Sequence, residues 1–422
     1  MSEWSADIVV GHATAANADE ALASVLAQLG VGSGAPFVSA GPHRHWRHAE
    51  QLGIVYLTDT WAPRLTEIVR QLRERTQVRT WVGAAGLGVC AIGTEYIDQP
   101  AIVVMIARLP ARSFQPFRNL QVLARLAVSG DDEDWRNMSP ESLAAPRTSG
   151  LLLHADGQAL DYAVQVADAR NLAGSDQTFG SAVERGDNWV TQYADGPVPH
   201  GLSGVRFLEP MRLFSRISQG LVPLGGEHIV THCTARRVVS LDGRPALDVL
   251  LADLNLPPLP EDADAQAVMQ ALQSSPARRG AYLGIAPPDH RNDARFDDTF
   301  LARRLRGVDT RQRTLELDPA PPVGAHVVFC TRDPASARAS LVRACTELRE
   351  QLENEGRVIR AAFYHGCAMR NRNVFSGGQQ ASVELALIRR HLGAVPLIGL
   401  YAGSQISGGY VHRYSGVLTA LA

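Results

Sequence analysis

Cys367 and His365 form the pair of residues that most resembles a thiol nucleophile with its base. Both belong to residues 363–367, which we predict as a strand running into a turn. A cysteine at such a turn beside a histidine is one arrangement that activates a thiolate. An elbow of this kind needs a glycine two residues after the nucleophile, and that position is Met369. We therefore expect no catalytic residue and interpret Cys367 as a structural or pocket-lining cysteine, with a cysteine-dependent hydrolase or amidase as the alternative.

Arg370 is the stronger candidate for contact with a ligand. It would project from the loop after the same predicted strand, and its planar guanidinium can hold a carboxylate or phosphate through two hydrogen bonds. The alternative is a structural or surface ion pair.

Two glycine-rich segments, residues 83–88 and 399–403, could offer exposed backbone amides to a polar ligand. The alternative is close packing of strand against helix. The spacing of Gly83, Gly86 and Gly88 does not fit a dinucleotide-binding fingerprint, and no helical periodicity follows it.

No cofactor or metal ion is expected. His43, His45 and His48 have spacing that can bind a metal, but no Asp or Cys flanks them and two arginines intervene, which favours a solvated loop. The five cysteines lie at positions 90, 233, 330, 345 and 367. Their number is odd and no pair has CxxC spacing, so neither a disulfide framework nor a structural zinc site is indicated.

Composition excludes several classes of protein. The 422 residues carry a formal net charge of -2, and 45% are hydrophobic, as in ordinary globular proteins. Nucleic-acid or membrane-surface binding would need a basic excess. All 41 basic residues are arginine, so functions that need a lysine, such as Schiff-base formation or Walker-A phosphate binding, are excluded. The N-terminus lacks signal-peptide character and no apolar run could span a bilayer, which predicts a cytoplasmic protein.

These candidate residues sit in a repeated order of elements. We predict strands at 8–10, 54–57 and 102–106, helices after Asn17 and over 65–72, and the glycine-rich segment 81–88 between them. The C-terminal half repeats this order with strands at 327–329, 359–364 and 417–421, helices after Asp333 and over 382–392, and residues 396–403. A weaker third copy spans 151–207.

The repeat predicts an α/β fold of mixed sheets with packed helices, in two modules of β-α-β-α-β-β pattern. Residues 110–150, 254–266 and 318–322 are expected to be connecting loops.

Several segments, in order along nearly the whole chain, resemble FIST domain proteins. They are residues 82–93 with Glu95-Tyr96, and then 219–225, 241–248, 282–285, 306–309, 367–370 with Phe375, 396–403 and 414–419. The resemblance implies a FIST N-terminal module over 1–210 and a FIST C-terminal module over 211–422. It also implies a sensory function in signal transduction, with an amino acid or related polar metabolite as the suspected ligand.

We predict a ligand site from this resemblance and from the general rule that α/β folds bind ligands at the carboxyl ends of their strands. Its residues are Arg370, Cys367, Gly399, Gly403, Gln405, Gly83, Gly86 and Tyr96. Many family members have Gly-Glu where this chain has Ser404-Gln405, which removes a carboxylate that could meet a ligand ammonium. The middle copy has Phe179-Gly180 where paired glycines are expected. A signalling partner that is not visible in the chain would detect the change caused by the ligand. The other alternative to a sensor is a scaffold that binds proteins through an exposed apolar patch.

Overall fold

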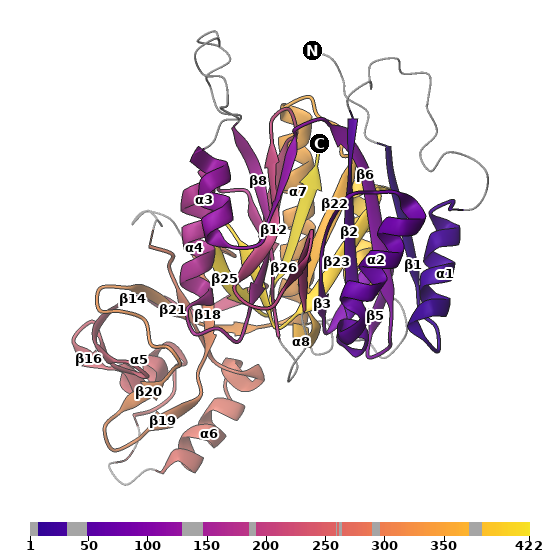
Figure 1. Ribbon diagram of the computed structural model, residues 1–422. Helices are drawn as coiled ribbons and strands as arrows, with labels where there is room; N and C mark the ends of the chain where they lie inside the picture. The colour runs from indigo at the N-terminus through magenta and orange to yellow at the C-terminus, as the bar shows by residue number, and fades with distance from the viewer. Residues whose placement is uncertain are drawn as a thin grey trace. The chain divides into compact units, whose positions relative to one another are not determined.

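The computed structural model of the chain describes residues 7–31, 49–128, 147–184, 191–258, 260, 264–288, 296–370 and 382–422. The chain divides into two compact units (Figure 1). The first combines Met1–Ile217 with Leu341–Ala422, and the second is Ser218–Ser340. The larger unit is built of mixed sheets with packed helices, and the second unit has an antiparallel sheet with packed helices, so the predicted α/β class is confirmed. Within the described residues, no helix is both long and apolar enough to span a membrane.

The first sheet of the larger unit contains the N-terminal strands. Its order is β1 (Asp7–Ala13), β6 (Ile102–Pro110), β2 (Ala49–Thr58), β3 (Thr80–Gly86), β10 (Gln192–Ala194) and β11 (Pro197–Val198). Helices α1 (Ala18–Gln28) and α2 (Leu65–Thr76) pack their apolar side chains against it, and the short η1 (Asp59–Arg64) precedes α2. The predicted cap is confirmed, because the Asn17 side chain accepts a hydrogen bond of 3.0 Å from the Glu20 amide.

Two further sheets complete the larger unit. One has the order β25 (Tyr410–Arg413), β24 (Ser404–Ser407), β9 (Thr178–Val183), β8 (Thr148–Asp156), β12 (Leu202–Leu208) and β7 (Phe114–Phe117). The other has the order β13 (Leu213–Ser218), β26 (Gly416–Leu421), β22 (Ala361–Cys367), β23 (Leu397–Ala402), β4 (Gly88–Ala91) and β5 (Thr94–Ile97).

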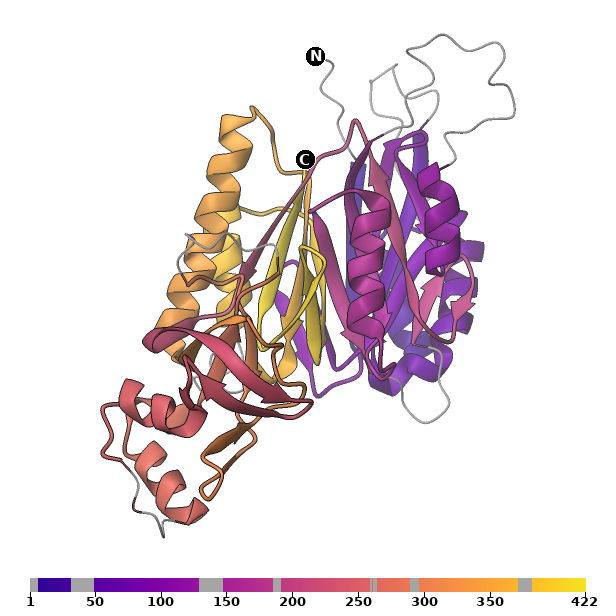
Figure 2. The ribbon, with the colours of Figure 1, turned by 90° about the vertical axis from the view of Figure 1, so that its left-hand side faces the viewer.

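Helices cover the outer faces of these two sheets. Helices α3 (Leu120–Val128) and α4 (Tyr162–Ala173) pack on the sheet that contains β8. Helices α7 (Pro334–Asn354) and α9 (Val383–Leu392) contribute apolar side chains to the cluster over β22 and β26; α7 is the long orange helix beside the yellow strands in Figure 2. Residues 110–150 were expected to form a loop, but the apolar residues 114–128 pair as β7 and pack as α3.

One pairing scheme recurs in all three sheets. A parallel strand pair is flanked by an antiparallel strand, and a glycine lies at the same register position each time: Val55↔Gly83, Leu153↔Gly180 and Tyr364↔Gly399. The hairpin that follows each pair joins a different sheet. Hairpin β4–β5 pairs with β23, hairpin β10–β11 with β3, and hairpin β24–β25 with β9. Residues from the N-terminal half therefore complete the sheet built by residues 361–421.

The second unit has its own sheet and core. The strand order is β18 (Leu301–Arg304), β17 (Tyr282–Ile285), β21 (His326–Arg332), β14 (Leu221–Thr234), β15 (Arg237–Leu241), β20 (Thr314–Glu316) and β19 (Gly307–Asp309), and β16 (Arg244–Pro245) pairs with β15. Helices α5 (Ala246–Asp253) and α6 (Ala265–Gln273) and the short η3 (Pro276–Arg279) pack against this sheet. Helix α6 begins inside the segment 254–266 that was expected to be a loop.

Candidate functional site

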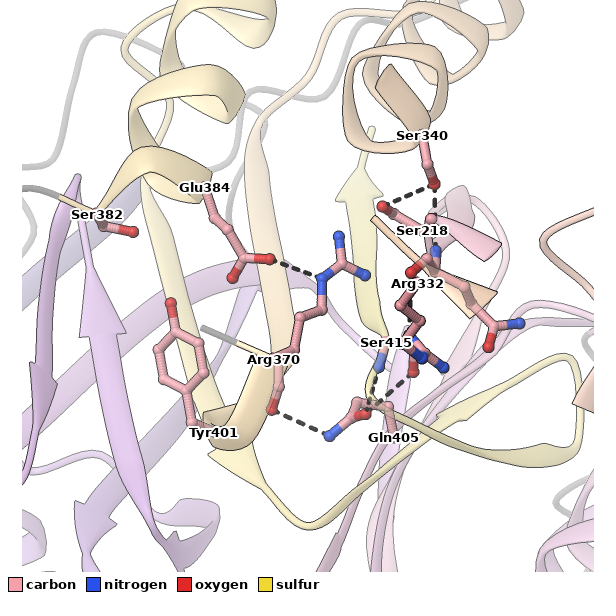
Figure 3. A network of polar contacts seen from close by, with 12 residues as sticks. Ser218, Arg332, Ser340, Arg370, Ser382, Glu384, Tyr401, Gln405 and Ser415 are labelled. Carbon is pink, nitrogen blue, oxygen red and sulfur yellow. Dashed lines mark hydrogen bonds and ion pairs between the residues drawn. The ribbon is translucent and has the colours of Figure 1, made fainter. Parts of the chain in front are cut away.

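Arg370 forms a buried ion pair with Glu384 at the carboxyl ends of the parallel strands β22 and β23 (Figure 3). Arg370 ends the single turn α8 (Ala368–Arg370), which follows β22 directly. Glu384 lies in the first turn of α9, where Ser382 caps the helix by accepting a hydrogen bond from the Leu385 amide. The Arg370 Nε lies 3.0 Å from Glu384 Oε1, and the two side chains are 1% and 0% exposed. The ion pair is therefore a buried one.

Burial controls the electrostatics of this pair. Removal from water raises the pKa of Glu384, and the positive charge of Arg370 opposes the effect. The Tyr364 hydroxyl is buried beside the Glu384 carboxylate, and burial together with that negative charge raises the pKa of Tyr364 well above its usual value. The sequence contained one signal for Glu384, an acidic residue two positions after a helix cap, but acidic residues at that position are usually exposed.

The N-terminal hairpin adds a second carboxylate to the same region. Tyr401, on β23, donates a hydrogen bond of 3.0 Å to Glu95 Oε2 on β5. The rings of Tyr401 and Tyr364 lie edge to face with centroids 6.2 Å apart. Burial raises the pKa of the neighbouring Cys90 thiol, and Glu95 and Glu384 raise it further. These residues, which sequence reasoning missed, connect Arg370 to a segment 275 positions earlier in the chain.

Gln405 is fully buried on β24, and both ends of its amide are bonded within the protein. Its Nε2 donates to the carbonyl oxygens of Gly366 and Ala402 at 3.1 and 3.0 Å. Its Oε1 accepts from the backbone amide and hydroxyl of Ser415 at 3.2 and 3.0 Å. This side chain joins the ends of strands β22 and β23 to the turn before β26, so it supports the region around Arg370.

The predicted glycines all lie in close packing. A Cβ at Gly83 would meet the Val55 carbonyl oxygen at 2.0 Å, and one at Gly399 would meet the Tyr364 carbonyl oxygen at 2.0 Å. A Cβ at Gly86 would lie 2.7 Å from the Tyr401 carbonyl oxygen, and one at Gly403 would lie 2.6 Å from Glu184 Oε1. At Gly83, Gly86 and Gly399 these contacts are with the backbone of other strands, where packing of strand against helix had been the alternative, and they are sufficient to explain the need for glycine. At Gly403 the contact is the end of the flexible Glu184 side chain, which can move away. Contact of these glycines with a ligand stays a prediction.

The remaining predicted residues lie at different places around this region. The Tyr96 hydroxyl lies 2.6 Å from His12 Nδ1 on β1, so the hydrogen bond that it forms there joins it to neither Arg370 nor Glu384. Cys367 is the last residue of β22 and is 2% exposed. Among the predicted residues, the structure thus brings Gly399 and Gly86 next to the tyrosines of the Arg370 cluster and places Gln405 beneath it.

Cys367 and His365 do not form a hydrogen-bonded nucleophile and base. In the described part of the chain, no hydrogen bond joins the Cys367 thiol to His365. The His365 Nε2 instead lies 3.3 Å from the Tyr56 hydroxyl. Burial, with a contribution from His154, lowers the pKa of His365 to about 3. A histidine with such a pKa is a weak base at neutral pH.

A second polar cluster lies where strands of the three sheets meet. The Tyr56 hydroxyl contacts His154 Nε2 at 3.2 Å as well as His365 Nε2. These residues occupy equivalent positions, each directly after the strand residue that faces the recurring glycine. Burial lowers the pKa of His154 to about 3, so both imidazoles are neutral at pH 7. This cluster links the three sheets through neutral hydrogen bonds.

Metal binding has little support in the described residues, which contain no group of three or more His, Cys, Asp or Glu side chains placed to hold an ion. His43, His45, His48 and Phe375 lie outside the described part of the chain.

The sequence matches the profiles of two known protein domains. The family profile for the FIST N domain matches residues 51–244, and that for the FIST C domain matches residues 246–407. The chain belongs to the FIST family. FIST domains are associated with sensory and signal-transduction roles. The two matches meet near residue 245, and the predicted module boundary at 210/211 stays a prediction.

Two mycobacterial proteins are similar to this chain in sequence. An uncharacterized protein of Mycobacterium bovis is 27% identical over 372 residues, which cover 85% of this chain and 86% of the relative. An uncharacterized protein of Mycobacterium tuberculosis is 30% identical over 226 residues, covering 53% of this chain and 52% of the relative.

Proposed function

We propose that this FIST protein is a cytoplasmic sensor that binds a small polar metabolite, an amino acid or a related compound, and passes the signal to a protein partner. The observation that carries the proposal is the buried pair of Arg370 and Glu384 at the carboxyl ends of β22 and β23. Ligands of α/β proteins bind at this end of parallel strands. Removing a guanidinium and a carboxylate from water is costly, so a buried pair is weak support for stability alone.

The pair also has the chemistry of an amino-acid site. A guanidinium can hold a carboxylate, and a carboxylate can hold an ammonium group. Position 405 carries no carboxylate in this chain, but Glu384 supplies one next to Arg370. A ligand with both groups would replace the internal ion pair with two external ones. This exchange would change the position of Arg370 at the end of β22, and a partner could detect that change.

We propose a non-catalytic function because the geometry gives little support to the hydrolase alternative. Among the described residues, no hydrogen bond joins the Cys367 thiol to a histidine, and the low pKa of His365 makes it a poor proton acceptor at neutral pH. The scaffold alternative predicts binding of proteins without stabilisation by any small molecule, so one experiment separates it from the sensor.

The experiment is thermal unfolding of the purified protein against amino acids, polyamines, nucleotides and organic acids. A ligand that binds the folded state raises its stability by about 2.7 kcal/mol at a hundredfold excess over the dissociation constant. The sensor proposal expects a dose-dependent rise in melting temperature with at least one compound.

The variant Arg370→Met/Glu384→Leu removes both charges together and so avoids an unpaired buried ion. It should fold and lose the ligand-dependent rise. The control Arg70→Met lies on the exposed face of α2 and should keep the rise. No rise with any compound at millimolar concentration would contradict the proposal, as would a rise that the double variant retains.

A further inference from the structure

Three buried side chains meet at the junction of the three sheets of the larger unit. Tyr56 is on β2, His154 on β8 and His365 on β22, and all three are 0% exposed. The Tyr56 hydroxyl lies 3.2 Å from His154 Nε2 and 3.3 Å from His365 Nε2. The ring centroids of the two histidines lie 5.5 and 6.0 Å from that of Tyr56, with the rings close to perpendicular. One hydroxyl group thus serves two histidines that come from the two other sheets.

This shared hydroxyl restricts where the protons of the two imidazoles can lie. A tyrosine hydroxyl donates one hydrogen bond, and a neutral imidazole has one N–H donor and one acceptor nitrogen. If both imidazoles carried their proton on Nδ1, the hydroxyl would donate to one Nε2 and face the lone pair of the other. If both carried it on Nε2, the hydroxyl proton would have no acceptor in the cluster. Opposite tautomers satisfy both contacts, because Tyr56 then donates to one histidine and accepts from the Nε2–H of the other.

The surroundings of the cluster provide no charge that could balance an added proton. The Cys90 thiol on β4 influences Tyr56 electrostatically, but burial raises the pKa of this thiol well above its usual value, so it is neutral. Phe179 packs on His365 with ring centroids 5.8 Å apart, and the hairpin strands β10 and β24 contribute the neutral amides of Gln192 and Gln405. The residues that pair directly with the three members in their sheets are all uncharged: Ala84, Val103, Ser181, Ser203, Leu400 and Val417.

A second proton on either imidazole would break the hydrogen bonds of the cluster. The imidazole that accepts from Tyr56 would become a donor at both nitrogens, so the hydroxyl proton would lose its acceptor. The imidazole that donates to Tyr56 would gain an Nδ1–H, and among the described residues neither Nδ1 atom has a hydrogen-bond partner. In both cases a cation would lie in the core without a carboxylate beside it, which is costly. Burial accordingly lowers the pKa of both His154 and His365 to about 3.

We propose that Tyr56, His154 and His365 form an acid-sensitive lock on the junction of the three sheets, which is closed while the two imidazoles are neutral and hold opposite tautomers. The lock does not depend on the sensor function proposed above. His365 lies on β22, five residues before Arg370, so opening of the lock would also loosen the strand that leads to the candidate site.

The direction of the pH effect follows from the two states of each histidine. In the folded protein the pKa of each imidazole is about 3, below the value of 6.5 for a solvated histidine. The opened or unfolded chain therefore binds protons first as the pH falls. Stabilisation by the lock is complete above about pH 6.5 and is lost progressively as the pH falls from there towards the folded-state pKa.

The first test is the pH dependence of urea unfolding of the full chain, followed by tryptophan fluorescence. All six tryptophans lie within residues 1–217, so the signal reports on the larger unit. The variant His154→Gln/His365→Gln keeps a side-chain amide at both positions and removes both titrating groups. Between pH 6.5 and about pH 4.5, the equilibrium constant for unfolding should rise roughly a thousandfold more in the unmodified protein than in the double variant. His200→Gln, at an exposed position in the same unit, is the matched control and should keep the steep pH dependence.

The second test observes the protons in the unmodified protein. The ring nitrogen signals of ¹⁵N-labelled histidine distinguish the Nδ1–H, Nε2–H and imidazolium forms in NMR spectra, and they can be assigned through the backbone signals. At about pH 7 one of His154 and His365 should be the Nδ1–H tautomer and the other the Nε2–H tautomer. Neither ring should titrate near pH 6.5 while the protein is folded.

Several results would overturn the lock. Parallel pH profiles of the unmodified protein and the double variant would show that the two histidines do not control the junction. A ring of the cluster that titrates near pH 6.5 in the folded protein would show that it is not held neutral, and identical tautomers would contradict the shared hydroxyl. If the double variant does not fold, the NMR result on the unmodified protein decides alone.

Discussion

Removing the charge of Arg370 alone should destabilise the larger unit strongly. The Arg370→Met side chain can fill much of the same space but leaves Glu384 as an uncompensated carboxylate with 0% exposure. Breaking a buried ion pair by removing one partner costs about 3–5 kcal/mol of unfolding free energy. Replacing both partners, as in Arg370→Met/Glu384→Leu, should cost much less, because no buried charge remains. The free energies of the two single variants and the double variant therefore should not add.

The tryptophans make the larger unit separately observable. All six lie within residues 1–217, and Ser218–Ser340 contains none. Urea unfolding followed by tryptophan fluorescence thus reports on the larger unit, which avoids averaging two units that can unfold independently. Glu384→Leu completes the double-mutant cycle. Arg70→Met, which breaks ion pairs on the exposed face of α2, is the control and should hardly move the urea midpoint.

The reasoning about Arg370 would be refuted by either of two results. One is a midpoint for Arg370→Met equal to that of Arg70→Met, which would show that Glu384 is not left buried and charged. The other is additive losses in the double variant, which would show that the two side chains act independently.

Three further predictions concern other parts of the chain. Gly180→Ala should lower the free energy of unfolding by at least about 3 kcal/mol in the same urea assay, because the φ of Gly180 is +145° and a Cβ would lie 1.9 Å from the Leu153 carbonyl oxygen. Gly174→Ala should lower it by only about 1–2 kcal/mol, because Gly174 has a φ of +62° and no atom would contact the added Cβ. Tyr56→Phe should cost about 1–3 kcal/mol, because two buried imidazoles lose their shared partner; a smaller loss would mean that they find another. In the second unit, burial lowers the pKa of His228, but hydrogen bonds to Asp242 and Asp253 outweigh burial and leave it raised. The protonated His228 therefore stabilises the second unit fully below about pH 6.5, and this stabilisation is lost as pH rises through the pKa of the folded state. Over that pH range, hydrogen exchange in residues 218–340 should accelerate more in the unmodified protein than in His228→Gln. Equal changes in both proteins would contradict this.

Local sequence rules were sufficient for most individual elements. Asn17 caps α1 as predicted, and Asp333 accepts a hydrogen bond of 2.9 Å from the Ser336 amide at the start of α7. The apolar periodicity over 65–72 marks the buried face of α2. Such signals depend on neighbours a few residues apart, so they are visible without the fold. The same rules misassigned residues 114–128, because β7 is held by pairing with the distant β12.

The sequence by itself determined the family, the α/β class and the position of Arg370 directly after a strand, because these depend on ordered motifs and short-range patterns. The tertiary structure decided which groups meet Arg370. Glu384, 14 residues away in the sequence, forms the ion pair with Arg370. Glu95, 275 residues away, acts on Glu384 by raising its pKa, because hairpin β4–β5 pairs with β23 in a different sheet from β3. Strand exchange of this kind follows from the packing of three sheets around a shared core, and no local spacing encodes it. The charge and the chemistry of the candidate site therefore come from contacts that only the folded chain creates.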